Sequence, residues 1–128
     1  MSKMADREKI KAFVQGVLCC GCAEEVFKII ESRHAKKGNV RYDRINIGNR
    51  LLIYVFRADD PEFVGEELPG ILLAGRKERD DRGFNRFRLV LATDAPAAGV
   101  AAMTAYKKTG LADDRLFIHV VHPAQIEF

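Results

Sequence analysis

All three cysteines of the chain stand within four positions, in the segment Leu18-Cys19-Cys20-Gly21-Cys22-Ala23. Cys19 and Cys22 form a C-x-x-C pair, and Cys20 and Cys22 form a C-x-C pair. The thiolate that such pairs provide is both the nucleophile of disulfide exchange and a ligand of soft metals. A disulfide framework, by contrast, distributes its cysteines along the chain. We therefore take Cys19, Cys20 and Cys22 as candidate ligands of Cu(I) or Zn(II), or as redox thiols.

The residues that follow the cysteines predict a helix from Ala23 to His34, because apolar side chains recur there at helical spacing. The free N–H groups and the positive dipole end at a helix start stabilise a thiolate, so Cys22 is expected to be the most reactive. Glu24 and Glu25 oppose this effect by like-charge repulsion. The alternative stays open that the cysteines are small apolar side chains filling a junction between two helices.

The stretch Gly16-Val17-Leu18-Cys19-Cys20-Gly21-Cys22-Ala23-Glu24-Glu25-Val26 resembles a loop and helix of heavy-metal-associated, copper-chaperone-like domains. That family has a G-M-x-C-x-x-C loop before its helix. The resemblance covers the chain from Ile10 to Phe56, where a hairpin follows the helix as in the family's βαββαβ order. It implies that Cys19 and Cys22 are the ligands of Cu(I) or a similar soft ion.

The three histidines do not extend the cysteine cluster into a closed zinc site, which needs four ligands. His34 is distant from the cysteines in sequence. His119 and His122 are three positions apart on a predicted strand, so they would point to opposite faces. We interpret His119 and His122 as ordinary strand-end or core residues.

The charged run from Arg76 to Arg88 includes Phe84 and Phe87, a mixture that surfaces for single-stranded nucleic acid also use. Acidic residues interrupt this run, and Phe87 alternates like a core residue, so we interpret it as a solvated helix end entering a strand. P-loop, dinucleotide-binding and nucleophile-elbow motifs are absent. The sequence argues against a nucleic-acid partner and leaves open whether the protein is an enzyme.

The composition is that of an ordinary folded protein: 128 residues, 48% hydrophobic and 30% charged, with a net charge of +3. One α/β domain spanning residues 1–128 is expected at this length. No apolar run approaches the roughly 20 residues of a membrane span. The N-terminus lacks the apolar core of a secretory signal. We therefore expect a cytoplasmic protein that does not enter a membrane.

Hydrophobic periodicity predicts the elements of the N-terminal half. The segment from Asp6 to Leu18 has the spacing of an amphipathic helix. The segment from Arg41 to Arg57 has the pattern of a hairpin with a two-residue type II′ turn at Gly48-Asn49. Its first strand is half polar and is expected at the sheet edge. Its second strand, Leu51 to Phe56, is apolar on both sides and is expected inside the sheet.

The C-terminal half alternates helices with strands. An Asp cap before Pro61 predicts a helix start, and Pro69-Gly70 predicts an interruption of that helix. Strands are expected over Phe84 to Thr93 and Asp114 to Val121, with a helix rich in small residues between them. The order is therefore ααββαβαβ. We predict an α/β fold with a four-stranded mixed sheet between two helical layers, its last three strands parallel; a ferredoxin-like α+β fold is the alternative.

Two functions are compatible with these features. The first is a small cytoplasmic thiol module that binds a soft metal or exchanges disulfides through the cysteine cluster. The second is a non-catalytic binding or assembly domain whose cysteines are structural. An edge strand and the apolar C-terminal residues Ile126 and Phe128 would then support a homodimer.

Overall fold

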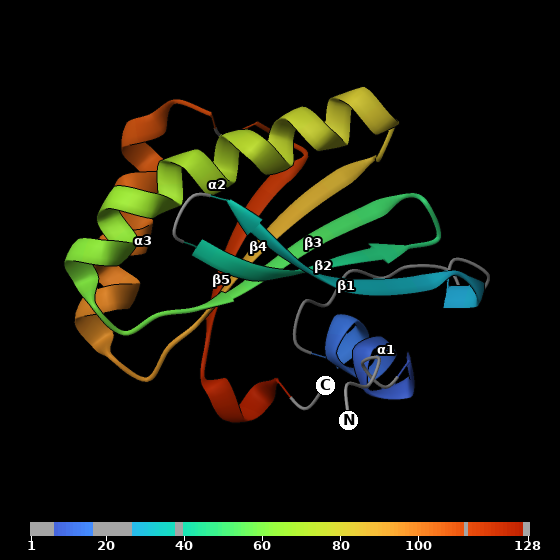
Figure 1. The fold of residues 1–128 in the computed structure, drawn as a ribbon, viewed down its shortest axis with the longest axis horizontal. Helices are drawn as coiled ribbons and strands as arrows, with labels where there is room; N and C mark the ends of the chain where they lie inside the picture. The colour runs from blue at the N-terminus through green and yellow to red at the C-terminus, as the bar shows by residue number, and fades with distance from the viewer. Residues whose placement is uncertain (1–6, 17–26, 38–39, 112, 127–128) are drawn as a thin grey trace.

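The computed structural model describes residues 7–16, 27–37, 40–111 and 113–126. Their centre is a five-stranded mixed sheet in which spatial order follows sequence order (Figure 1). The strands are β1 (Ile30–Lys37), β2 (Val40–Ile47), β3 (Leu51–Arg57), β4 (Arg86–Ala92) and β5 (Leu116–Val121). The helices are α1 (Arg7–Gly16), α2 (Pro61–Arg82) and α3 (Pro96–Thr109), and a short 3₁₀ segment, η2 (Pro123–Gln125), follows β5.

The prediction of a four-stranded sheet is wrong, because part of the predicted second helix is a fifth strand. Residues Ile30 to Lys37 form β1, which pairs antiparallel with β2 from Ile30 opposite Ile47 to Lys37 opposite Val40. Helical spacing ends at Ile30, and the residues after it are polar enough for a strand at the edge of a sheet. The ferredoxin-like alternative is also wrong, since β3, β4 and β5 are neighbours that pair in parallel.

The predicted hairpin is confirmed, but its register and its position in the sheet differ from the prediction. Gly48 and Asn49 both have positive φ, 63° and 57°, which is the signature of a type I′ turn instead of type II′. Ile47 pairs with Leu51, so three residues form the loop and not two. The first strand of the hairpin, β2, is interior because β1 adds to its other side. Its polar side chains therefore need partners within the protein.

Helix α2 begins as predicted and does not break at Pro69. The side chain of Asp60 accepts a hydrogen bond from the backbone N–H of Glu62 (3.0 Å), and Gly83 ends the helix at φ 76°. Pro69 lacks an N–H and crowds the preceding turn, which normally kinks a helix. Here buried side chains on both sides of it, among them Leu68, Ile71 and Leu72, hold the helix against the sheet.

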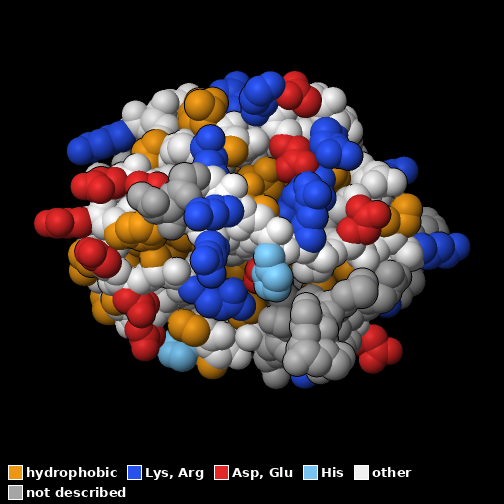
Figure 2. Space-filling model, in the orientation of Figure 1, with side chains coloured by type: hydrophobic (Ala, Val, Ile, Leu, Met, Phe, Trp, Pro, Cys, Tyr) orange, Lys and Arg blue, Asp and Glu red, His pale blue; other side chains and the backbone are white. Residues whose placement is uncertain are grey.

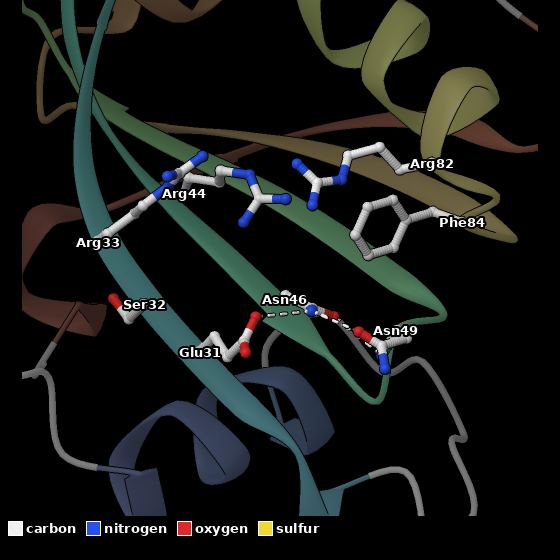
Figure 3. Close-up of a pocket in the computed structure, with 8 residues that line it drawn as sticks. All are labelled: Glu31, Ser32, Arg33, Arg44, Asn46, Asn49, Arg82 and Phe84. Carbon is white, nitrogen blue, oxygen red and sulfur yellow. Dashed lines mark hydrogen bonds between the residues drawn. The ribbon is translucent and has the colours of Figure 1, made fainter.

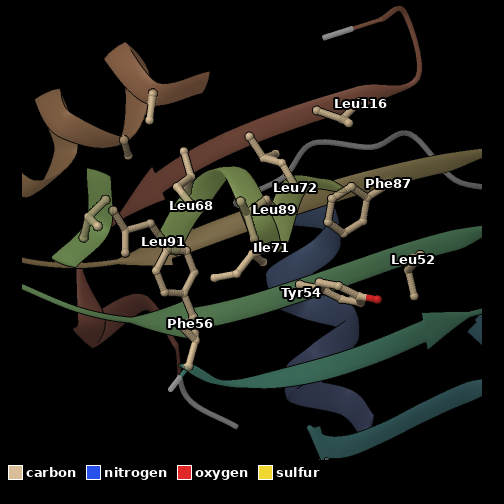
Figure 4. Close-up of a cluster of buried hydrophobic side chains, with 14 of the residues drawn as sticks. Leu52, Tyr54, Phe56, Leu68, Ile71, Leu72, Phe87, Leu89, Leu91 and Leu116 are labelled. Carbon is tan, nitrogen blue, oxygen red and sulfur yellow. The ribbon is translucent and has the colours of Figure 1, made fainter. Parts of the chain in front are cut away.

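Helices α2 and α3, which connect the parallel strands, together cover one face of the sheet (Figure 1). Figure 4 shows the core between these two helices and the sheet, to which β3, β4 and β5 contribute alternate residues. The larger side chains of this core are Leu52, Tyr54, Phe56, Leu68, Ile71, Leu72, Phe87, Leu89, Leu91 and Leu116. Among the described residues, none of the helices combines the length and the apolar character that crossing a membrane requires.

Helix α1 covers the opposite face, and its helical structure confirms the prediction from spacing. Ile10, Phe13 and Val14 are buried in a second core cluster with Ile30 of β1 and Ile53 of β3. Strand β3 is consequently buried on both faces and interior to the sheet, also as predicted. Val17 and Leu18, at the end of the predicted helix, lie outside the described residues.

Candidate functional site

The candidate thiols Cys19, Cys20 and Cys22 lie outside the described residues, as does most of the first half of the predicted helix Ala23–His34. The chain is described up to Gly16 at the end of α1 and again from Phe27. Within the described ranges, no group of three histidine, cysteine, aspartate or glutamate side chains could hold a metal ion. The chemistry that the structure does describe is built from arginines and carboxylates.

Each of the three histidines has a contact within the fold. The ring of His34, largely exposed, lies 2.7 Å from Asp43 on the neighbouring strand. His122 Nδ1 accepts a hydrogen bond from Ala124 N–H (3.0 Å) and caps η2. His119 Nε2 accepts from Arg88 Nη1 (2.8 Å); burial, and then the charge of Arg88, lower the pKa of His119. The contacts of His119 and His122 agree with the prediction of ordinary strand-end or core residues.

A network of buried charge joins α2 to the middle of the sheet. Arg44 on β2 is only 7% exposed, and its Nε and Nη2 lie 2.7 and 2.6 Å from Oε2 of Glu78 on α2. The other carboxylate oxygen of Glu78 accepts a hydrogen bond from the hydroxyl of Tyr54 on β3. Burial acts to raise the pKa of Glu78, but the hydrogen bonds from Arg44 and Tyr54 outweigh it and the pKa is lowered. Glu78 is therefore an ionised anchor that fixes Arg44.

A second buried arginine stabilises the far end of α2. Arg79, 1% exposed, donates two parallel hydrogen bonds of 2.9 Å to the carboxylate of Asp113, which precedes β5. Such a bidentate pair is strong and directional. The hydrogen bonds from Arg79 hold the pKa of Asp113 below its usual value. This pair ties the C-terminal end of α2 to the entry of β5.

Low pH should destabilise the fold, because it protonates the carboxylates of Glu78 and Asp113. The folded-state pKa values of Asp113 and Glu78 lie below their ordinary values of 3.8 and 4.5. The ionised carboxylates therefore stabilise the fold above those ordinary values, and that contribution is lost as pH falls through the lowered folded-state pKa values. Urea unfolding at a series of pH values should show the free energy of unfolding falling below about pH 4. The fall should be smaller in Asp113→Asn, and an identical pH profile in that variant would contradict the assignment.

A groove lies beside the buried network, on the face of the sheet that α2 and α3 cover only in part (Figure 3). Its volume is about 490 Å³. The floor comes from β1 and β2, and the far wall comes from the end of α2, the turn after it and the β2–β3 hairpin. The lining residues are Glu31, Ser32, Arg33, Arg44, Asn46, Asn49, Arg82 and Phe84. Three guanidinium groups from three different elements thus meet at one polar groove.

On the face seen in Figure 2, Lys and Arg side chains gather over the middle of the molecule, where Figure 1 shows β1 and β2, with Asp and Glu side chains among them. Sequence reasoning missed the groove because Arg33, Arg44 and Arg82 have no common spacing. The available signal was the polar character of β2, which we interpreted as that of an edge strand.

A separate, apolar surface lies at the β5 edge of the sheet. Val120 on β5 is 40% exposed, and on the adjoining helix α3 Val100 is 66% and Met103 38% exposed. A shallow groove bordered by these side chains extends along α3 from Asp94 to Lys107. We call Val100, Met103 and Val120 the β5-edge surface. Phe117, 36% exposed, points to the opposite face of the same strand.

Comparisons with protein families, with curated proteins and with solved structures find no match to this chain.

Proposed function

We propose that the protein is an assembly domain that forms a homodimer through β5. The observation that carries this proposal is the contrast between the two edges of the sheet. Strand β1, at one edge, exposes Glu31, Arg33, Lys36 and Lys37. Strand β5, at the other edge, has the sequence Leu-Phe-Ile-His-Val-Val, without a charged residue, proline or glycine. Natural sheets protect a free edge with charge, proline or bulges, and β1 has such protection whereas β5 has none.

A second copy of β5 fits this edge in an antiparallel arrangement. Residues Arg115 and Val121 direct their carbonyl groups toward β4, so by alternation the N–H and C=O groups of Ile118 and Val120 point away from the sheet. In the described part of the chain no strand pairs with them. A twofold axis perpendicular to the sheet would pair the two β5 strands and keep both α3 helices on the same face. The β5-edge surfaces of the two copies would then meet.

Charge along α3 also favours an antiparallel copy. Asp94 stands at the beginning of the groove beside α3, and Lys107 stands at its far end. In the twofold arrangement α3 and its copy run in opposite directions. The acidic end of each groove would therefore lie near the basic end of the other, an arrangement that fixes orientation.

Substitution of an exposed apolar residue by glutamate tests the dimer. We expect sedimentation equilibrium to give a dimer for the unchanged protein and a monomer for Val100→Glu and Val120→Glu, because like charges would face each other across the twofold axis. Val100 is 66% exposed, so Val100→Glu should change the free energy of unfolding by less than about 0.5 kcal/mol. The matched control is Leu73→Glu on α2, which is 54% exposed and distant from β5 in the sequence.

Leu73→Glu should remain dimeric. An unchanged protein that is monomeric at all attainable concentrations would contradict the proposal. Equal dissociation by Leu73→Glu and Val100→Glu would contradict it too, because the interface would then not be the β5 edge.

The thiol module remains a second proposal, supported by the clustering of every cysteine between residues 19 and 22. Val14, near the end of α1, and Phe27, where the described chain resumes, are both buried in the same core cluster. By the copper-chaperone resemblance, Cys19 and Cys22 would bind Cu(I). The cytoplasm would keep such a thiol cluster reduced. Thiol titration with and without Cu(I) or Zn(II) tests this proposal; thiols that react only after unfolding would exclude it.

A further inference from the structure

The groove lined by Arg33, Arg44 and Arg82 has an excess of positive charge. Arg44 is paired with Glu78, and Arg82 Nη1 lies 3.9 Å from the same carboxylate oxygen. Among the described residues, no carboxylate forms an ion pair with Arg33. The carboxylates at the groove are Glu31 and Glu78, against three arginines. The balance leaves one positive charge that a bound anion would neutralise.

Arg44 is a fixed cation, and the exposed side chains of Arg33 and Arg82 on either side of it can adjust their positions. Glu78 fixes the guanidinium of Arg44 through Nε and Nη2, and Nη1 makes none of these bonds. The Arg82 side chain is 62% exposed at the end of α2, and Arg33 is exposed on β1. Figure 3 shows the Arg82 guanidinium directed toward Arg44. Arginine presents a planar fork of donors that matches the oxygens of a carboxylate or a phosphate.

The opposite side of the groove can hydrogen-bond the uncharged part of a ligand. Asn46 donates to Glu31 (3.0 Å) and to the side chain of Asn49 (2.8 Å), which places these polar groups in one connected row. The volume of about 490 Å³ is within the range of small-molecule sites. A ligand with one anionic head and a polar body matches both sides of the groove.

We propose that this groove binds a small molecule carrying a carboxylate or phosphate group, with the oxyanion held between Arg82 and Arg33 against Arg44. The site is separate from the β5-edge surface, since it uses β1, β2 and the end of α2. Binding would therefore proceed whether the protein is a monomer or a dimer.

Titrations monitored by ¹H–¹⁵N NMR test the site, with inorganic phosphate and sodium acetate as probes and sodium chloride at matched ionic strength as reference. We expect saturable shifts of the backbone amides of Arg33, Arg44 and Phe84 with phosphate or acetate. The tighter of the two probes identifies the head group. Chloride should not reproduce these shifts.

Arg82→Gln removes one donor group and, with it, the 3.9 Å contact of Arg82 with Glu78, but it leaves the shorter Arg44–Glu78 contacts in place. It should weaken binding about tenfold or more. Arg57→Gln is the matched control, because Arg57 is also a half-exposed arginine but pairs with Asp43 outside the groove. Arg57→Gln should bind as the unchanged protein does. Thermal unfolding of both variants checks that they are folded. The proposal is overturned if neither probe saturates, if chloride gives the same shifts, or if Arg82→Gln binds as tightly as Arg57→Gln.

Discussion

Glu78→Ala should lower the free energy of unfolding by about 3 kcal/mol, because it leaves a buried arginine without its counter-charge. Arg44 is 7% exposed, and Glu78 is its only ion-pair partner among the described residues. The substitution also leaves the hydroxyl of Tyr54 without the carboxylate that accepts its hydrogen bond. Urea unfolding at neutral pH measures the change. The effect should be among the largest that a single polar residue of this protein can give.

The matched control is Glu66→Ala, an exposed glutamate of the same helix, which should change the free energy of unfolding by less than about 0.5 kcal/mol. A double variant, Arg44→Met with Glu78→Leu, should recover much of the loss, because apolar residues can replace a buried ion pair. Equal losses in Glu78→Ala and Glu66→Ala would show that the network is not a stabilising one.

Gly75→Ala should destabilise the protein by about 3 kcal/mol, at the upper end of what overpacking costs. Gly75 lies on α2 directly over β4, and a Cβ there would overlap the ring of Phe87. Phe87 is fully buried, so its ring can make room only by displacing other core side chains. The absence of a side chain at Gly75 therefore sets how closely α2 approaches the sheet. Thermal or urea unfolding measures the loss.

Gly65→Ala is the control for this prediction, because Gly65 is in the same helix and a Cβ there meets nothing within 4 Å. It should stabilise the protein by roughly 0.5–1 kcal/mol through helix propensity. Adding Phe87→Leu to Gly75→Ala should restore part of the lost stability. If Gly75→Ala and Gly65→Ala had the same effect, the close contact of α2 with β4 would be refuted.

The parts of the fold that the sequence predicts are those whose signal is local. Helix α1 has an apolar stripe, β3 is apolar on both sides, and α3 begins at Pro96 and ends before Gly110. The strand β1 could not be predicted in this way, because its structure depends on pairing with β2 over its whole length. Helix α2 continues through Pro69 for the same kind of reason, since burial of its neighbours outweighs a local helix breaker.

The groove and the β5-edge surface are products of the tertiary arrangement. Arg44 and Arg82 are 38 positions apart in the chain, and only the packing of α2 across β3 brings them together. The polar pattern of β2 indicated an edge strand, whereas it in fact reflects the charge network on one of its faces. Sequence patterns locate the apolar faces of elements well, but they do not tell which polar residues from distant elements will meet.

Hydrogen exchange of the β5 amides, measured by NMR at increasing protein concentration, tests the proposed assembly most directly. The N–H groups of Ile118 and Val120 point away from β4, so in a monomer they exchange with solvent without protection from the sheet. If two β5 strands pair, exchange at Ile118 and Val120 slows as concentration rises, and it stays fast in Val100→Glu. Equally fast exchange of both amides at every concentration would contradict the dimer.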